Sequence, residues 1–141
     1  MTNTNERNER NRLLIKEFRS NEGKTSGGFA ERPLLLLSTV GAKTGHQRTH
    51  PLMYLPDNDC WIVFASKGGG PTSPDWFHNL VANPTVTVEV GTETFEADAT
   101  VVTGEERDRL YAKQAQLYSV FADYQQRTTR KIPVIALARK K

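Results

Sequence analysis

Short strand-like segments that follow one another through turns constrain the fold of this chain most strongly. Leu34–Val40 is an apolar segment, and a glycine-bearing turn at 41–45 separates it from the alternating segment 48–55. A turn of Pro, Asp, Asn and Asp at 56–59 leads into a further apolar segment at 61–65. Such short connections favour antiparallel hairpins, because a parallel crossover needs roughly a dozen residues or more. The first half of the chain is therefore expected to form an antiparallel sheet.

Three more strands are expected in the second half of the chain. Thr85–Val90 and residues 94–102 alternate between polar and apolar side chains, Gly91 and Thr92 supply a turn between them, and an apolar segment follows at 133–137. The sequence thus predicts a mainly β domain of the α+β class, in which about six antiparallel strands form a barrel with helices on its rim. A chain of 141 residues, 37% of them hydrophobic, is long enough to bury one core and shows no second domain.

Helix signals lie between these strands. Ser73 is a residue type that caps helices, and the proline after it suits a first helical turn. Thr103 and Glu106 have the spacing of a capping box, in which the hydroxyl and the carboxylate each bind a free amide at the helix start. The expected helices cover residues 9–19, Asp75–Ala82, 104–118 and 122–127.

Residues 1–32 are expected to lie outside the barrel, which takes residues 33–141. The polar residues 1–11 are expected to fray. Apolar side chains at helical spacing among arginines make 9–19 a short amphipathic helix. Its expected role is to pack on the barrel, with contact to a membrane surface as the alternative. Residues 21–30 include three glycines and are expected to form a flexible linker.

Cysteine usage and hydropathy narrow the class of protein. Cys60 is the single cysteine, which excludes an internal disulfide and fits a reducing compartment. The polar N-terminal segment has no apolar signal-peptide core, so a cytoplasmic location is expected. No apolar run approaches the ~18 residues of a membrane span. The histidines have no carboxylate or cysteine partners at metal-ligand spacing, so no metal site is expected.

The charge distribution indicates the kind of ligand. The net charge is +3, and residues 127–141 carry six basic residues and no acid. This favours an acidic small molecule or an anionic surface over a neutral ligand. No basic stripe with interleaved aromatic residues and no known binding motif accompanies the charge, so no nucleic-acid partner is expected.

Three segments carry residues that suit an anion. The turn at 41–45 presents Lys43 and backbone amides, Arg48 begins the next strand, and Ser66 and Lys67 with three glycines precede a helix start. In a hairpin barrel these segments are expected to meet around one groove. Each feature alone is also typical of a plain solvated turn. Aromatic residues that suit either the walls of a ring site or the core are Trp76, Phe77, Tyr118, Phe121 and Tyr124.

The order and spacing of these motifs resemble those of a known family. The strings that carry the resemblance, within residues 34–137, are LLLLSTVGAKTGHQRTHPLMYL, FASKGGGPTSPDWFHNLVANPTVTVEVG and FADYQQRTTRKIPVIAL. On these strings the chain resembles the deazaflavin-dependent nitroreductases, which belong to the split β-barrel flavin and deazaflavin oxidoreductase superfamily. The resemblance implies an FMN-binding-like split β-barrel that uses coenzyme F420, with FMN as the alternative cofactor.

Coenzyme F420 is a deazaflavin with a phosphate and a polyglutamate tail, so it is strongly anionic. The resemblance implies that Ala42, Lys43, Thr44 and Arg48 hold the phosphate and the tail. It also implies that a larger set of residues contacts the cofactor or the acceptor: beside the deazaflavin ring, at the start of the helix expected at Asp75–Ala82, and beside the acceptor. These residues are Thr49, His50, Pro51, Leu52, Met53, Phe64, Ala65, Ser66, Lys67, Asp75, Trp76, Phe77, His78, Asn79 and Phe121.

The reaction implied by the resemblance is transfer of a hydride from reduced F420 to an organic small molecule, namely a quinone, an activated alkene or a nitro compound. Ser66 and Tyr124 are the expected catalytic residues, as hydrogen-bond partners or proton donors near the ring. Met53 and Phe121 stand where relatives that act on bicyclic nitroimidazoles tend to carry tyrosines, which favours a quinone-like acceptor. The alternatives are an FMN-binding split-barrel reductase and a non-enzymatic carrier of F420 or a lipid. The oligomeric state does not follow from the sequence.

Overall fold

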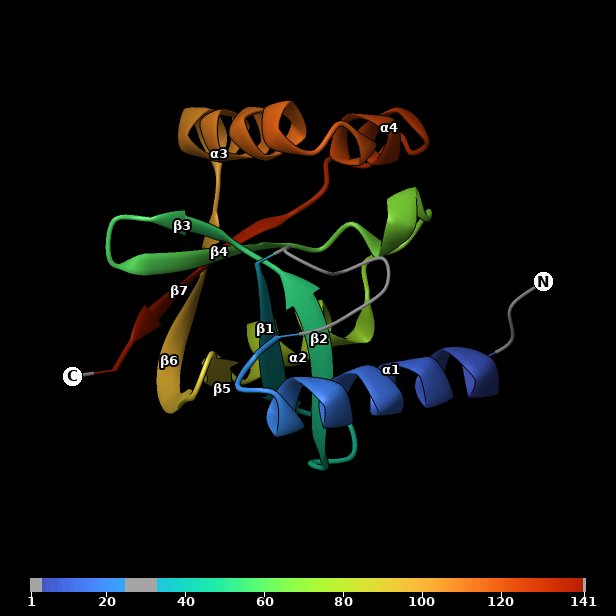
Figure 1. Ribbon diagram of the computed structural model, residues 1–141. Helices are drawn as coiled ribbons and strands as arrows, with labels where there is room; N and C mark the ends of the chain where they lie inside the picture. Colours follow the sequence, from blue (N-terminus) through green and yellow to red (C-terminus); the bar gives the residue numbers. More distant parts are fainter. Residues whose placement is uncertain (1–3, 25–32, 141) are drawn as a thin grey trace.

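The computed structural model describes residues 4–24 and 33–140 and consists of one antiparallel sheet flanked by helices (Figure 1). Within these residues the sheet has seven strands in the order β2-β1-β5-β6-β7-β4-β3, and all neighbouring pairs are antiparallel. The strands are β1 Leu34–Val40, β2 Gln47–Met53, β3 Leu55–Asp57, β4 Cys60–Phe64, β5 Thr85–Val90, β6 Glu93–Val102 and β7 Val134–Arg139. The expected fold class, mainly β with flanking helices, is confirmed.

The expected strand at 48–55 is divided into β2 and β3, which adds one strand to the expected number. Tyr54 lies between the two, and its backbone N–H donates to Pro33 O at 3.1 Å. β2 pairs with β1, with His50 opposite Leu37, whereas β3 pairs with β4. The two outer strands of the sheet are thus almost consecutive in the chain. The sheet must therefore curl into an open barrel to bring its ends together.

β1 is apolar along most of its length because both of its faces are covered. Leu35 and Leu37 belong to the core inside the curled sheet. Leu34 and Leu36 belong to a separate apolar cluster with Phe18 of α1. Each fully buried leucine contributes about 1.5–3 kcal/mol through the water-exposed area that it loses. The run of four leucines therefore joins the N-terminal helix to the barrel.

The N-terminal helix α1 spans Thr4–Ser20 and so begins earlier than the expected helix at 9–19, within the segment 1–11 that was expected to fray. Its apolar side packs on β1 and β2. Arg19 also fixes the helix, because its Nε and one terminal nitrogen donate to the two carboxylate oxygens of Glu89 at 3.0 and 2.8 Å. Of the expected linker at 21–30, residues 21–24 form a turn after the helix, and the remainder lies outside the described residues.

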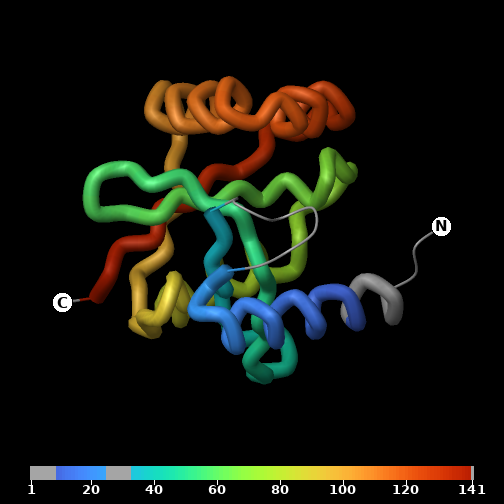
Figure 2. The backbone as a smooth tube through the Cα atoms, viewed as in Figure 1, coloured from blue at the N-terminus to red at the C-terminus, as the bar shows by residue number. Residues whose placement is uncertain are grey.

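Three further helices flank the sheet: α2 Asp75–Ala82, α3 Gly104–Leu117 and α4 Val120–Gln126. α3 and α4 follow one another along one side of the molecule, and α1 lies at the opposite side (Figure 2). α2 packs against β1 and β6. Within the described ranges, all helices are too short or too polar to cross a membrane.

Both predicted helix caps are replaced by contacts with arginines. Thr103 is the N-cap of α3, but its side chain makes no capping hydrogen bond, and Glu106 binds Arg109 instead. Before α2 the N-cap position is held by a proline, and Ser73 Oγ accepts a hydrogen bond from Arg130 at 3.1 Å. A guanidinium is a stronger partner for an oxygen acceptor than a backbone amide, which explains why Glu106 and Ser73 do not bind helix amides.

Candidate functional site

Three adjoining cavities follow β2 from one end to the other. The first, of about 620 Å³, lies between the turn at 41–45 and α2. The second, of about 640 Å³, is enclosed by α1, β2 and α2 and shares Arg48, Asp75 and Asn79 with the first. The third, of about 300 Å³, continues from Pro51 to the loop after β4. The second and third cavities are lined by consecutive residues of β2, His50 and Pro51, and we call the three cavities together the β2 groove.

Most of the site residues predicted from the sequence line the β2 groove. They are Ala42, Lys43, Thr44, Arg48, Thr49, His50, Pro51, Leu52, Met53, Phe64, Ser66, Lys67, Asp75, Trp76, His78, Asn79, Phe121 and Tyr124. The structure does not bring Ala65 and Phe77 to the groove. The Ala65 side chain is fully buried in the core, and Phe77 lines a separate cavity of about 210 Å³ beside the start of α3. Consecutive residues of one element point in different directions, so the neighbours Phe64 and Trp76 face the groove instead.

The turn at 41–45 uses its own amides to keep its shape. Gly41 N–H donates to His46 O at 2.8 Å, and Gly45 N–H donates to Gly41 O at 3.0 Å. The amides of these two glycines are therefore not available to an anion, because the fold already pairs them. The positive charge available to a ligand here is that of the exposed side chains of Lys43 and Arg48.

Asn79 connects α2 to the turn. Its Oδ1 accepts a hydrogen bond from Ala42 N–H at 3.0 Å, and its Nδ2 donates to Thr39 Oγ1 at 3.2 Å. The asparagine is only 8% exposed, so both partners are needed to satisfy its buried amide. Asn79 therefore fixes the position of the turn that carries Lys43.

The loop after β4 is held by Arg130, a residue that sequence reasoning missed. Its guanidinium donates to Ala65 O at 3.2 Å, to Ser66 O at 2.9 Å, to Gly70 O at 3.0 Å and to Ser73 Oγ at 3.1 Å. The only signal in the sequence is its place in the string FADYQQRTTRKIPVIAL. The residues that Arg130 binds lie 57 to 65 positions away in the sequence, so these contacts leave no local pattern in it.

The loop also pairs two of its own amides. Gly69 N–H donates to Ser66 O at 2.9 Å, and Gly70 N–H donates to Lys67 O at 3.1 Å. Gly69 and Gly70 therefore do not offer free amides to an anion. Lys67 is exposed, and its Nζ lies 3.4 Å from Thr72 Oγ1. As in the turn at 41–45, the lysine side chain supplies the charge.

The third cavity has an aromatic wall. The ring of Phe121 packs edge-on against Phe64 and Tyr124, with centroids 5.5 and 5.3 Å apart. Ser66 and Tyr124 line the cavity, and their hydroxyls make no hydrogen bond within the described part of the chain. Tyr118, another candidate for a flat wall, packs instead at the edge of the core cluster beneath α3 and α4.

His50 lies midway along the groove, and its Nδ1 is buried and has no hydrogen-bond partner among the described residues. Burial lowers the pKa of His50, the nearby carboxylate of Asp75 opposes this shift, and the positive charge of Arg48 adds to it. The imidazole is therefore neutral at neutral pH. An unpaired buried polar atom costs on the order of 1–3 kcal/mol, which a polar group of a ligand could recover.

α1 forms a wall of the second cavity that was not predicted from the sequence. The direction in which a helix packs on a sheet depends on contacts far apart in the chain, here those of Phe18 with β1. The residues that α1 contributes to the wall are Asn11, Arg12, Ile15 and Arg19.

The chemistry of the β2 groove fits an elongated anion with a planar, apolar end. Lys43 and Arg48 mark the end beside the turn, and Lys67 lies at the other. Trp76 and Phe121, 4% and 6% exposed, form an apolar floor in the third cavity. These residues fit a deazaflavin that carries a phosphate and carboxylates.

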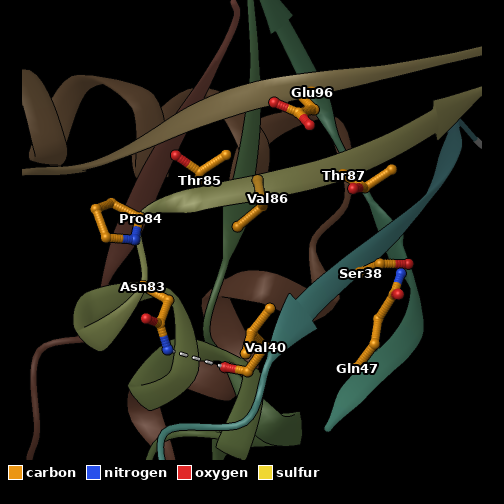
Figure 3. A pocket seen from close by; sticks show the side chains of 9 residues that line it. All are labelled: Ser38, Val40, Gln47, Asn83, Pro84, Thr85, Val86, Thr87 and Glu96. Atoms are coloured by element: carbon orange, nitrogen blue, oxygen red, sulfur yellow. Dashed lines mark hydrogen bonds between the residues drawn. The ribbon is translucent and has the colours of Figure 1, made fainter. Parts of the chain in front are cut away.

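A separate cavity of about 440 Å³ lies between the ends of β1 and β5 (Figure 3). Asn83 Nδ2 closes one side of it by donating to Val40 O at 3.4 Å. Its lining mixes polar and apolar side chains and is uncharged except for Glu96, which would repel an anion. None of the site residues predicted from the sequence lines this cavity.

Comparisons with known proteins agree with the resemblance seen in the sequence. The sequence model of the F420H(2)-dependent quinone reductase family matches residues 10–139. An F420H(2)-dependent quinone reductase of Mycobacterium tuberculosis is 44% identical over 113 residues, which are 77% of this chain and 74% of that protein. A solved F420-H2 dependent reductase is 40% identical, with a TM-score of 0.69 over 75% of this chain and 94% of its own.

A second solved structure is described as a domain-swapped dimer. It is 36% identical, with a TM-score of 0.71 over 94% of this chain and 95% of its own. The family match covers nearly the whole described barrel together with the helix that packs on it. On this evidence the chain belongs to the F420H(2)-dependent quinone reductase family.

Proposed function

We propose that this protein reduces a quinone-like small molecule with a hydride from reduced coenzyme F420, and that the β2 groove holds both reactants. The observation that carries this proposal is that the β2 groove has a cationic half, at Lys43 and Arg48, and an aromatic half, at Trp76 and Phe121. F420 has the same division into an anionic tail and a planar ring. When bound, reduced F420 supplies the hydride, and the protein binds and orients the reactants.

The cationic half binds the phosphate and tail through side chains. Lys43 projects from the turn that Asn79 fixes, and Arg48 projects from the start of β2 just after that turn, so both charges are held near one place although both side chains are exposed. Arginine presents a planar fork of donors that suits phosphate and carboxylate, and lysine adds a point charge. Lys67 supplies the corresponding charge at the loop after β4.

The aromatic half orients the ring and the acceptor. Pro51, Leu52 and Met53 form one wall, and Phe121 forms another. Packing of a planar ring between such walls excludes water and limits its orientation to a narrow range.

Ser66 and Tyr124 serve the acceptor through their hydroxyls, which face the same cavity and have no partner among the described residues. A hydroxyl donor within reach of a quinone oxygen stabilises the negative charge that develops there as the hydride arrives. Either hydroxyl can then hold the proton that the oxygen takes up.

The acceptor proposed is a quinone rather than a nitroimidazole because of two hydroxyl-free side chains. Met53 and Phe121 line the third cavity, and neither can hydrogen-bond the polar edge of a nitroimidazole. A flat quinone needs only apolar contact and one or two donors to its oxygen.

The apolar side of α1 is packed on the barrel, which supports a role as a wall of the site rather than a membrane contact.

Replacing Arg48 or Lys43 by alanine should weaken F420 binding several-fold, because each side chain contributes an ion pair to the anionic tail. The effect should shrink as salt rises, since both side chains are exposed and their charges are screened. Fluorescence titrations with F420 and with FMN, at low and high salt, measure this. Lys113→Ala is the control, because it removes one exposed positive charge from α3, away from the groove.

Unaltered protein should bind F420 more tightly than FMN, whose single phosphate lacks the polyglutamate charges. Equal affinity for the two cofactors, or an F420 affinity that does not change with salt, would contradict the proposed binding mode.

A further inference from the structure

His50 differs from its neighbours on β2 because its side chain titrates near neutral pH and is partly enclosed in the β2 groove. It lies between Arg48, which carries a permanent charge, and the apolar Leu52, on an outer strand of the sheet. Its ring lines the second cavity, yet Nδ1 is enclosed and unpaired. A titratable ring with one unpaired nitrogen in an anion-binding groove suggests a role for its protonation.

The charged groups around His50 come from every element that lines this cavity. From β2 there is Arg48, and from α2 there is Asp75, with His78 in the adjoining cavity. α1 adds Arg12 and Arg19. The two arginines of α1 already have carboxylate partners, Arg12 in Glu9 and Arg19 in Glu89.

The charge of Arg48 is not offset in this way, because within the described residues it has no ion-pair partner. In the free protein, burial together with Arg48 therefore outweighs Asp75 and keeps the imidazole neutral.

We infer that His50 becomes protonated when an anionic ligand enters the β2 groove, and that it then serves as a further cation that holds the ligand. This inference rests on the proposed function, with F420 as the anion. A phosphate or carboxylate beside Arg48 offsets its repulsion of an imidazolium, and it adds an attraction to the one that Asp75 already exerts. It also gives the ring a hydrogen-bond acceptor, which is the partner that a protonated imidazole needs on each nitrogen.

The consequence is that binding of F420 takes up a proton. The pKa of His50 is then higher in the complex than in the free protein, so the extra affinity is present at low pH and is lost as pH rises through the value in the complex. One coupled proton changes affinity by up to about tenfold per pH unit within the window between the two pKa values.

The test compares unaltered protein with His50→Asn, which keeps a neutral polar side chain of similar size. F420 affinity is measured at about pH 6 and about pH 8 at constant ionic strength, a range in which only histidine among ordinary side chains titrates. The unaltered protein should gain at least several-fold more affinity on acidification than His50→Asn does. His46→Asn is the control, because His46 is exposed in the turn, and it should behave as unaltered protein.

A second measurement does not depend on the variant. In unaltered protein at neutral pH, the imidazole nitrogen resonances of His50 should change from the neutral to the cationic pattern when F420 is added. The same pH dependence in unaltered protein and His50→Asn, or a His50 ring that stays neutral in the complex, would overturn this inference alone. A failure of unaltered protein to bind F420 at either pH would overturn the proposed function and the inference with it.

Discussion

Replacing Arg130 by methionine should abolish measurable F420 binding and lower the free energy of unfolding by about 3 kcal/mol, the largest loss expected at any single side chain near the groove. The guanidinium binds three backbone carbonyls, of Ala65, Ser66 and Gly70, and the hydroxyl of Ser73. Methionine fills similar space but leaves all four acceptors without this donor. Because the loop carries Ser66 and Lys67 into the third cavity, its displacement would remove them from the site.

Two variants separate this effect from the mere loss of a charge. Lys131→Met removes the next positive charge in the chain, which forms only an exposed ion pair with Asp108, and should change stability by less than about 1 kcal/mol. Arg130→Lys keeps the charge but cannot reach carbonyls on both sides of the loop, so it should resemble the methionine variant in F420 binding. Chemical denaturation and cofactor titration measure the two effects. Normal F420 affinity in Arg130→Met would show that the loop does not need this anchor.

Replacing Gly69 by alanine should destabilise the protein by about 3 kcal/mol or more, whereas Gly68→Ala should cost only about 1 kcal/mol. Both glycines have positive φ, 82° and 63°, so both substitutions carry a similar backbone strain. The two positions differ in the space available for the added methyl group. A Cβ at Gly69 would lie 2.8 Å from Tyr124 O and 3.0 Å from Tyr124 Cα, whereas a Cβ at Gly68 would meet nothing within 4 Å.

The contact at Gly69 is with backbone atoms of α4, so the neighbour cannot simply change its rotamer. Gly69→Ala should therefore push α4 away from the loop and, with it, displace Tyr124 and Phe121 from the third cavity. Thermal unfolding and F420 titration of the two variants, side by side, measure the difference. Equal losses of stability in Gly68→Ala and Gly69→Ala would mean that the loop and α4 are not packed as closely as the structure has them.

The sequence predicted the parts of the fold that depend on local signals. The turn at 41–45 fixed the first hairpin, and the second hairpin formed as expected although its turn is shorter than the predicted 56–59: Pro56 and Asp57 belong to β3, which leaves residues 58 and 59 as the turn. The division of the expected strand at 48–55 could not be predicted, because it depends on pairing with two different strands: β2 pairs with β1, whereas β3 pairs with β4 at the other end of the sheet. The two caps failed for a similar reason: Arg109 and Arg130 bind the oxygens that local rules assign to helix amides.

The candidate site likewise contains residues that could be predicted from the sequence and residues that could not. Residues on β2 and α2 were predicted because the resemblance implies their roles, and the structure brings most of them to one groove. The wall from α1 and the anchor Arg130 depend on tertiary packing and left no pattern in the sequence. The sequence did not show that the amides of Gly41, Gly45, Gly69 and Gly70 would be used within their own turns. The charged side chains beside these turns remain as the anion-binding groups.

The proposed function is best tested by the rate at which menadione oxidises reduced F420, measured without oxygen as the return of the visible absorbance of oxidised F420. We expect a rate that is proportional to protein concentration, saturates with both reactants and exceeds the rate with a bicyclic nitroimidazole. Tight binding of F420 without any protein-dependent oxidation would identify a carrier instead of a reductase. Faster turnover of the nitroimidazole would contradict the proposed effect of Met53 and Phe121 on the choice of acceptor.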